Sequence, residues 1–215
     1  MRLSKELIKR FRSVEVANVA DANRNLALGR VKSLSPYLLP RHRQDRQLRM
    51  VGQALTAACE GDDFHVMVQA LNSNPSPGTV LCVQTDGNGA CGGDLFASEC
   101  KRLQFGGLLV DGNIRDVANI RRLDFPVYSH GTNPVAGTNN NKGKLGVDLH
   151  IGSNDLQAKI RSGDIIFGDD DGAVVIAIDC DSELQILLDE AERIHKREGA
   201  ILSQVAAGTP LLSCF

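Results

Sequence analysis

The residues best suited to chemistry are two carboxylates and one guanidinium. Asp94 is followed, after twenty intervening residues, by the adjacent pair Arg115 and Asp116. Carboxylate oxygens suit Mg²⁺ or Mn²⁺, and few protein ligands suffice because Mg²⁺ keeps several of its waters. The planar arginine fork binds a carboxylate in two places. These side chains therefore favour a hard divalent cation together with a substrate that carries a carboxylate.

A strand–helix–strand unit is expected to position these side chains. Its three elements are predicted from apolar runs and turn residues: a strand at 79–83, a helix at 94–103 and a strand at 107–110. In such a unit the carboxyl ends of the two strands lie side by side, with the start of the helix above them. Asp94, Arg115 and Asp116 are therefore predicted to share one cleft. Taken singly, Asp94 could equally cap its helix, and the other two could close a surface turn.

The glycine-rich stretch before this helix allows a competing interpretation, a dinucleotide site. Residues 87–92 match G-x-G-x-x-G between a predicted strand and a predicted helix, and Asp111 follows at a suitable distance. A pyrophosphate, however, needs the bare positive end of the helix. Asp94 places a carboxylate there, which would repel the phosphates and satisfy the helix dipole itself. The dinucleotide site therefore ranks below the carboxylate–arginine site.

Six cysteines are present, and none forms a C-x-x-C pair. Several lie inside apolar runs, which favours free, mostly buried thiols in a reducing compartment. Cys91 is the best candidate for a catalytic alternative, because it lies just before a predicted helix start, where a thiolate would be stabilised. No partner histidine can be identified for it. The structural interpretation of the cysteines is therefore preferred.

The composition excludes several classes of partner. The chain has 215 residues, of which 42% are hydrophobic and 23% charged, and a formal charge of −2. These values favour one globular domain over residues 1–215, with two small domains also allowed by the length. Strands interspersed with helices indicate an α/β or α+β domain. Without a basic excess we expect no nucleic-acid partner. No apolar run approaches the roughly 20 residues of a membrane helix, and the N-terminus lacks a secretory apolar stretch. A cytoplasmic protein without membrane association is expected.

The remaining elements follow from apolar periodicity and turn residues. Further helices are predicted at 4–12, 14–26, 64–71, 117–123 and 182–204. Further strands or extended segments are predicted at 51–59, 126–129, 146–151, 165–168 and 173–178, with 27–50 and 132–144 irregular. Ser4 is expected to cap the first helix, and Ser182 with Gln185 to form a capping box on the last. A turn at Asp111-Gly112 and an acidic hairpin turn at 169–172 complete the prediction.

An ordered set of short motifs resembles the metal-dependent members of the RraA-like family. Gly93-Asp94, followed after twenty residues by Arg115-Asp116, matches the family pattern G-D-x20-R-D. The other segments that resemble family motifs occur along the chain in the family's order: 21–22, 50–56, 61–63, 110–116, 125–128 with Gly131, 162–165 and 168–172. Each motif is weak alone, but the set is specific and covers roughly residues 14–200.

The resemblance implies a fold, a reaction and an assembly. The fold would be a layered sandwich of the swivelling β/β/α type, a central β-sheet flanked by helices. The reaction would be that of 4-hydroxy-4-methyl-2-oxoglutarate aldolases and oxaloacetate decarboxylases, which release pyruvate from a 2-oxo acid with Mg²⁺ or Mn²⁺. Relatives form homotrimers or dimers of trimers, with sites at subunit boundaries.

The resemblance also implies residue roles. Asp116 would bind the metal, Arg115 would contact the pyruvyl substrate and stabilise its enolate, and Asp94 would hold the metal's waters and orient one as a base. Backbone N–H groups of Gly92, Leu95 and Phe96 are expected to bind the substrate carboxylate. The family also contains non-catalytic regulators that bind ribonuclease E. The acid pair favours the enzyme, because an inert regulator has no need of two carboxylates around an arginine.

Departures from the family pattern are expected to affect substrate choice and not the metal site. Gln53 and Ser162 replace family prolines, and the Asn-rich loop at 134–146 is longer. Lys142 and Lys144 in that loop are interpreted as solvated lysines, since the mechanism needs no lysine.

Overall fold

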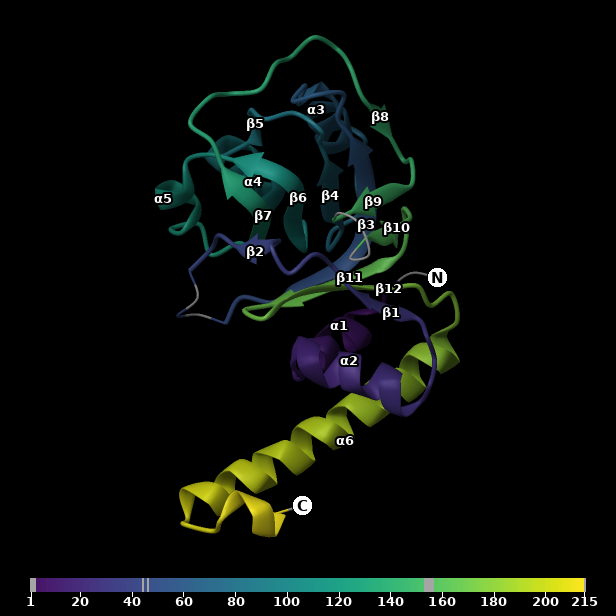
Figure 1. Cartoon of the computed structure of the whole chain (residues 1–215). Coiled ribbons are helices and arrows are strands. Elements are labelled where there is room, and N and C mark those ends of the chain that lie inside the picture. Colours follow the sequence, from purple (N-terminus) through teal and green to yellow (C-terminus); the bar gives the residue numbers. More distant parts are fainter. Residues whose placement is uncertain (1–2, 44, 46, 153–156, 215) are drawn as a thin grey trace.

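The computed structural model describes residues 3–43, 45, 47–152 and 157–214. A ten-stranded sheet follows the order β1-β12-β11-β3-β4-β6-β7-β2, with β5 beside β6 and β8 beside β3 (Figure 1). Its strands are β1 Val31–Ser33, β2 Leu39–Pro40, β3 Met50–Ala58, β4 Val80–Gln84, β5 Ala90–Gly92, β6 Gly107–Ile114, β7 Val127–Thr132, β8 Lys144–Leu145, β11 Ile165–Asp169 and β12 Gly172–Ile176. A separate antiparallel pair is formed by β9 Leu149–Ile151 and β10 Ala158–Ile160.

Helices flank this sheet, as predicted for an α/β fold. They are α1 Lys5–Phe11, α2 Val16–Asn25, α3 His65–Asn72, α4 Asp94–Arg102, α5 Val117–Ile120 and α6 Asp181–Ala206, followed by a 3₁₀ turn at Leu211–Cys214. One core joins α3, α4 and α5 to β4 and β6, for example through Met67, Ala97 and Leu108. A second core joins α1, α2 and α6 to β11 and β12, on the lower side of the sheet in Figure 1.

The centre of the sheet is parallel, and this arrangement creates the site. β3, β4, β6 and β7 run in the same direction. Residues Val80, Leu81, Cys82 and Val83 of β4 are buried and alternate between two cores, which explains their unbroken apolar run. The carboxyl ends of β4 and β6 lie side by side, with Gln84 opposite Asp111. The predicted strand–helix–strand unit is therefore confirmed.

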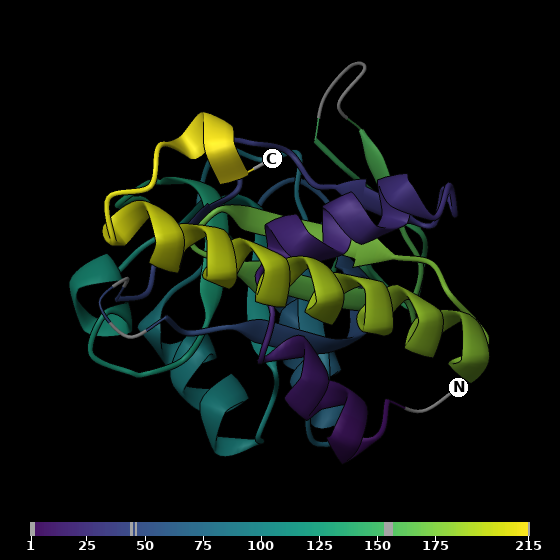
Figure 2. The ribbon, with the colours of Figure 1, turned by 90° about the horizontal axis from the view of Figure 1, so that it is seen from below.

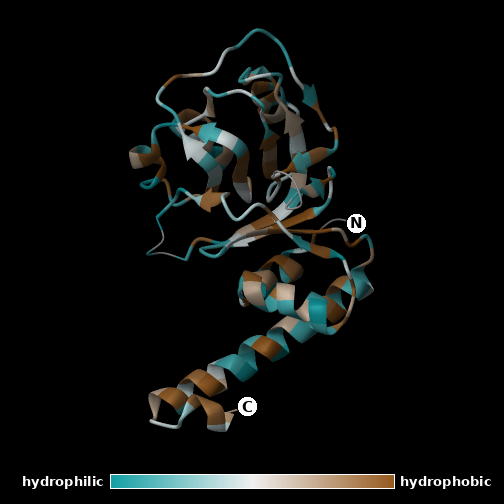
Figure 3. Cartoon of the chain, in the orientation of Figure 1, coloured by the Kyte–Doolittle hydropathy of each residue, from teal (hydrophilic) through white to brown (hydrophobic). Residues whose placement is uncertain are grey.

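The longest helix, α6, lies across the antiparallel strands (Figure 2). Its buried residues recur every three or four positions, which turns one face toward the core: Leu184, Leu187, Leu188, Ala191 and Ile194. Figure 3 shows a hydrophilic middle and an apolar C-terminal end on this helix. Among the helices of the described residues, none is long and apolar enough to cross a membrane.

Helix caps and the hairpin test the local predictions. Ser4 caps α1 as predicted, because its side chain accepts a hydrogen bond from the N–H of Leu7. The acidic turn closes a hairpin in which Asp169 pairs with Gly172. The capping box at Ser182 is wrong: α6 already starts at Asp181 with Cys180 as N-cap, which places Ser182 inside the first turn.

Three strand predictions also need correction. The turn expected at Asp111-Gly112 does not form, because β6 continues to Ile114. Its pairing with β7 shifts register between Val110 and Asn113, which includes the two residues of the expected turn. The glycine-rich loop contains β5, which pairs with the extended end of β6. The segment 27–50, which was predicted to be irregular, contains β1 and β2. These short edge strands pair with β12 and β7, and strand propensity alone does not reveal such pairing.

Candidate active site

Asp94 is fixed at the start of α4 by a contact with α5. It is the first helical residue, and Gly93 is the N-cap. The Asn119 side-chain amide donates a hydrogen bond to Asp94 Oδ2 (2.7 Å), and the Asn119 backbone N–H donates to the carbonyl of Asp116 (2.9 Å). Asn119 therefore ties the Asp94 carboxylate to the segment that carries Arg115 and Asp116.

Arg115 and Asp116 directly follow β6. The Arg115 N–H donates to the carbonyl of Gly92 (3.0 Å), which holds the two segments together. Arg115 Nε lies 3.4 Å from Asp116 Oδ2, and both side chains remain partly exposed, at 42% and 37%. Asp116 adopts a left-handed backbone with φ 61° and ψ 31°, a conformation that costs free energy and clusters at functional sites. The backbone thus holds this carboxylate beside the guanidinium.

A pocket of about 380 Å³ opens beside this pair. Its wall comes from α4 and its N-terminal loop, the end of β6, the α3 region and residue 136: Phe64, Leu71, Ala90, Cys91, Gly92, Gly93, Leu95, Phe96, Glu99, Arg115, Asp116 and Ala136. Five of the six predicted site residues line it, and the sixth, Asp94, lies next to Gly93 in the chain. Arg115 and Asp116 thus share one pocket wall as predicted, whereas Asp94 is not among the described residues that line it.

The predicted substrate-binding residues contribute to this pocket in different ways. Gly92 ends β5, and Leu95 and Phe96 lie in the first turn of α4, where N–H groups have no carbonyl within the helix to bind. Leu95 is 77% exposed. The Phe96 ring packs edge-on against Phe64 with centroids 5.6 Å apart.

A family model with the description "RraA-like: Aldolase/RraA" matches residues 16–175. The chain belongs to the RraA-like family. A protein of Halalkalibacterium halodurans named "Putative 4-hydroxy-4-methyl-2-oxoglutarate aldolase" is 30% identical over 172 residues, which cover 80% of this chain and 76% of the relative.

Two solved structures resemble this chain in fold. Streptomyces coelicolor RraAS2, described as an unusual member of the RNase ES inhibitor RraA protein family, aligns with a TM-score of 0.71 and 28% identity over 93% of this chain and 96% of its own. An uncharacterized protein from Pseudomonas syringae pv. tomato aligns with a TM-score of 0.80 over 100% and 98% of the two chains. At 19% identity the second likeness supports the fold alone. The RraA-like family thus holds proteins named as aldolases and others named as ribonuclease inhibitors.

The acids of this RraA-like site fit a hydrated divalent cation better than a fully protein-bound one. Within the described residues no group of three or more His, Cys, Asp or Glu side chains could hold a metal. Asn119 occupies Asp94 Oδ2 and Arg115 approaches Asp116 Oδ2, which leaves one oxygen on each carboxylate. Mg²⁺ binds through one or two carboxylates and keeps several waters. Asp94 and Asp116 therefore fit such an ion, with waters completing its shell.

Gly93 lets Asp116 approach the start of α4. A Cβ at this position would lie 2.6 Å from Asp116 Oδ2 and 3.2 Å from Arg115 Cγ. We expect Gly93→Ala to keep the fold, since φ is −165°, but to displace the carboxylate and lower activity about 100-fold, as a shift near 1 Å can. Gly199→Ala is the matched control, because its Cβ would meet open space. Equal activity in both variants, measured at the same metal concentration, would show that the close approach is unimportant.

The competing interpretations of the glycine-rich segment lose support. A Cβ at Gly87 would lie 2.3 Å from the backbone N of Asp62, and one at Gly89 equally close to Asp62 Oδ2. These glycines therefore allow packing against the 61–62 turn, where a dinucleotide fingerprint would need open space for phosphates. Cys91 is fully buried, and a hydrogen bond to the Cys59 thiol together with burial raises its pKa well above the usual range. It is therefore poorly suited to be a thiolate nucleophile.

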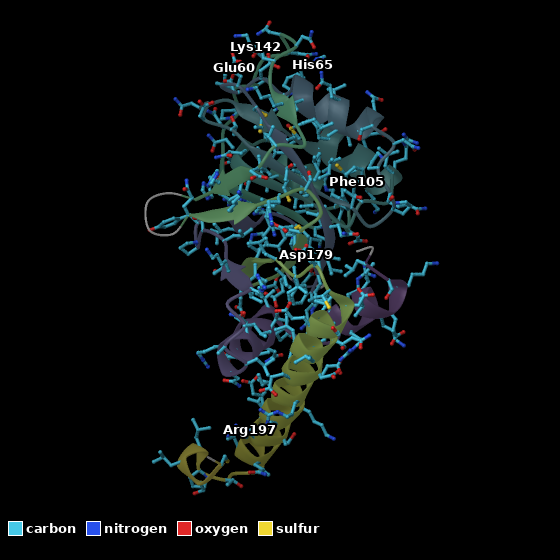
Figure 4. The ribbon with its side chains drawn as sticks, turned by 90° about the vertical axis from the view of Figure 1, so that its right-hand side faces the viewer. Glu60, His65, Phe105, Lys142, Asp179 and Arg197 are labelled. Carbon is cyan, nitrogen blue, oxygen red and sulfur yellow. The ribbon has the colours of Figure 1, made fainter. Side chains whose placement is uncertain are left out.

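The Asn-rich loop after β7 is tied to the neighbouring turn and α3. Lys142 Nζ pairs with Glu60 Oε1 at 2.9 Å, and His65 Nδ1 lies 2.8 Å from Asn139 Oδ1; Glu60, His65 and Lys142 lie near one another in Figure 4. Lys142 is thus an exposed, ion-paired loop residue, in line with its sequence interpretation.

Sequence reasoning missed three contributors to the site. Asn119 positions Asp94, and Phe64 and Leu71 form apolar wall on the α3 side. A lone Asn in a short predicted helix carries no signal for such a contact. α3 contributes to the pocket wall because β3 and β4, the strands before and after it in the chain, are neighbours in the sheet. The residue pattern of a single strand cannot reveal which strand lies beside it.

Proposed function

We propose that this RraA-like chain is a divalent-metal-dependent lyase that releases pyruvate from 4-hydroxy-2-oxo acids, from oxaloacetate, or from both. The observation that carries this proposal is that Gly93, the residue directly before Asp94, lies against Asp116, and that Arg115 and Asp116 share one pocket wall. The name of the Halalkalibacterium relative supports the same class of reaction. The direct test is metal-dependent pyruvate release by the purified protein.

Arg115 has the chemistry to stabilise the charge that both reactions create. Cleavage next to C3 of a 2-oxo acid leaves an electron pair that is delocalised onto the 2-oxo oxygen as an enolate. Arg115 donates from its planar fork to that oxygen and to the neighbouring carboxylate. The N–H groups of Leu95 and Phe96 at the positive end of α4 orient the same carboxylate.

A divalent cation bound at Asp116 would supply Lewis acidity at the 2-oxo oxygen. Asp94 serves a different step, the removal of the C4 hydroxyl proton in aldol cleavage. Its Oδ2 is engaged by Asn119, so Oδ1 is the oxygen left to take part in that proton transfer. Decarboxylation of oxaloacetate has no hydroxyl proton to remove and depends less on Asp94.

Asp94→Asn separates these roles. Asn keeps the size of the residue and can present its amide oxygen to Asn119, and Asn and Asp are comparable at helix starts. We expect aldol cleavage to fall at least about 100-fold, the usual contribution of a general base, and oxaloacetate decarboxylation to fall less. Both activities are measured on the same variant at a metal concentration that restores occupancy. Equal losses would contradict the base role, and no loss would reduce Asp94 to a helix-start residue.

The rival proposal is a non-catalytic regulator of ribonuclease activity. It is favoured by the 28% identity to Streptomyces RraAS2 over nearly the whole chain. The two proposals differ in what the acid pair does. If the chain is a regulator, the wild-type protein and the Asp94→Asn variant should inhibit ribonuclease equally well. If it is a lyase, its turnover should depend on Asp94. Ribonuclease inhibition without any pyruvate release would favour the rival.

The proposed assembly is a homotrimer or a dimer of trimers. Leu95 in the pocket wall and Val135, next to the pocket residue Ala136, are 77% and 65% exposed. Exposed apolar side chains of this size beside a pocket suit burial by a neighbouring subunit. Light scattering tests the assembly, and a monomer at assay concentration would contradict it.

A further inference from the structure

The pocket beside Arg115 joins a small polar region to a larger apolar wall. The polar region consists of Arg115, Asp116 and the backbone of Gly92 and Gly93. The apolar wall is formed by residues from the α3 and α4 regions and residue 136: Phe64, Leu71, Phe96 and Ala136. A pyruvyl group bound to the polar region therefore has its C4 substituent close to apolar side chains.

This apolar wall is held in place by packing. The rings of Phe64 and Phe96 meet edge-on at 67°, and together with Leu71 they pack on the core shared by α3 and α4. The pocket volume, about 380 Å³, falls in the range of small-molecule sites and exceeds what a pyruvyl group alone would fill. The wall is thus a preformed surface for an additional part of the substrate.

The charges lining the pocket disfavour a second substrate carboxylate. Arg115 is the one cation among the described residues that line it, and the other charged side chains are Asp116 and Glu99. Arg102 donates two hydrogen bonds to Glu99, at 2.7 and 2.6 Å, and these lower the Glu99 pKa. Glu99 therefore stays negative at neutral pH, and the Arg102 guanidinium is already engaged.

A carboxylate at C4 would be placed poorly against this wall. It would lose water against phenyl and alkyl side chains, and an anion without a partner is costly to bury. Among the described residues that line the pocket, no cation other than Arg115 could pair with it, and Arg115 is assigned to the pyruvyl group. An alkyl or aryl group at C4 would instead exclude water from the same surface.

We infer that the substrate is a 4-hydroxy-2-oxo monocarboxylate whose C4 carries an apolar alkyl or aryl group in place of a second carboxylate. This inference rests on the proposed lyase function. In the reaction the C3–C4 bond breaks, its electron pair stays on the pyruvyl fragment, and the C4 hydroxyl gives up its proton. C4 becomes the carbonyl carbon of an apolar aldehyde, and the enolate gains a proton at C3 to give pyruvate.

A matched pair of substrates tests the inference on the wild-type protein. We compare 4-hydroxy-2-oxohexanoate, with an ethyl group at C4, and 4-hydroxy-2-oxoglutarate, with a carboxylate there, at saturating Mg²⁺. The expected kcat/KM favours the ethyl compound by at least about tenfold, the lower end of hydrophobic-pocket discrimination. Equal or better turnover of the dicarboxylate would overturn the inference and leave the lyase standing. Release of no pyruvate from either compound, nor from oxaloacetate, would overturn both.

A variant pair separates the effect of the wall from the intrinsic reactivity of the two substrates. Leu71→Arg adds a guanidinium whose alkyl stem can lie along the apolar wall, whereas Leu71→Met keeps the wall apolar. The ratio of kcat/KM values should shift at least about tenfold toward the dicarboxylate in the Arg variant and stay near wild type in the Met variant. An unchanged ratio in a folded, active Leu71→Arg protein would overturn the assignment of this wall to the C4 substituent.

Discussion

Asp116→Ala is expected to abolish metal-dependent pyruvate release while the fold persists. Asp116 is the proposed direct metal ligand, and its side chain makes no capping hydrogen bond to α5, so its loss leaves the packing largely intact. Alanine in the left-handed conformation at φ 61° costs about 1–2 kcal/mol of stability. Activity is measured across a Mg²⁺ titration, and the fold by thermal unfolding.

Asp116→Asn is the matched control for the backbone effect. Asn tolerates the left-handed conformation better than Ala and keeps the size of the side chain, but it removes the charge that binds the cation. The Asn variant should therefore unfold near the wild-type temperature and still be inactive, or require far more Mg²⁺. Unchanged turnover of either variant at saturating Mg²⁺ would count decisively against a ligand role for Asp116.

Arg115→Lys is the second change with a large expected effect, although it keeps the charge. Arg115 Nε is 3.4 Å from Asp116 Oδ2, and the two terminal nitrogens carry four further N–H donors for the substrate. Lysine loses this planar geometry. Removing one transition-state donor of this kind costs roughly 2.7–4 kcal/mol, or about 100- to 1000-fold in kcat. We expect a loss of that size with oxaloacetate and with hydroxy acid substrates alike.

The control for this change is Arg193→Lys on α6. Arg193 forms an exposed ion pair with Glu190 on the same helix, far along the chain from the pocket residues. Its substitution should leave kcat/KM unchanged, because exposed pairs contribute little. If Arg115→Lys lowered activity less than about tenfold, equivalent to about 1.4 kcal/mol, Arg115 would be a structural residue that supports Asp116.

The parts of the fold that could be predicted have strong local signals. The continuously apolar stretch of β4 required burial on both faces, and Ser4 had the residue type and position of an N-cap. The start of α6 and the short strand β5 could not be predicted in the same way. Glycine and alanine in β5 give no strand propensity, and its formation depends on the extended end of β6.

The site could be predicted in its polar residues but not in its shape. Spacing along the chain placed Asp94 near Arg115 and Asp116, because parallel neighbouring strands end at the same sheet edge. The Asn119 contact and the α3 wall depend on how α5 and α3 pack, which a single sequence does not specify. The left-handed backbone at Asp116 was likewise invisible, since the sequence shows an ordinary Arg-Asp pair.

The central claim is that Asp94, Arg115 and Asp116 form the site of a metal-dependent lyase. Pyruvate release tests it most directly, measured on the purified wild-type protein with oxaloacetate and with 4-hydroxy-2-oxo acids that carry either an apolar group or a carboxylate at C4. The protein is first stripped with a chelator and then supplied with Mg²⁺ or Mn²⁺. The account predicts release that disappears on stripping and returns with either ion. No release from any of these substrates in the presence of metal, or equal release with and without it, would contradict the account.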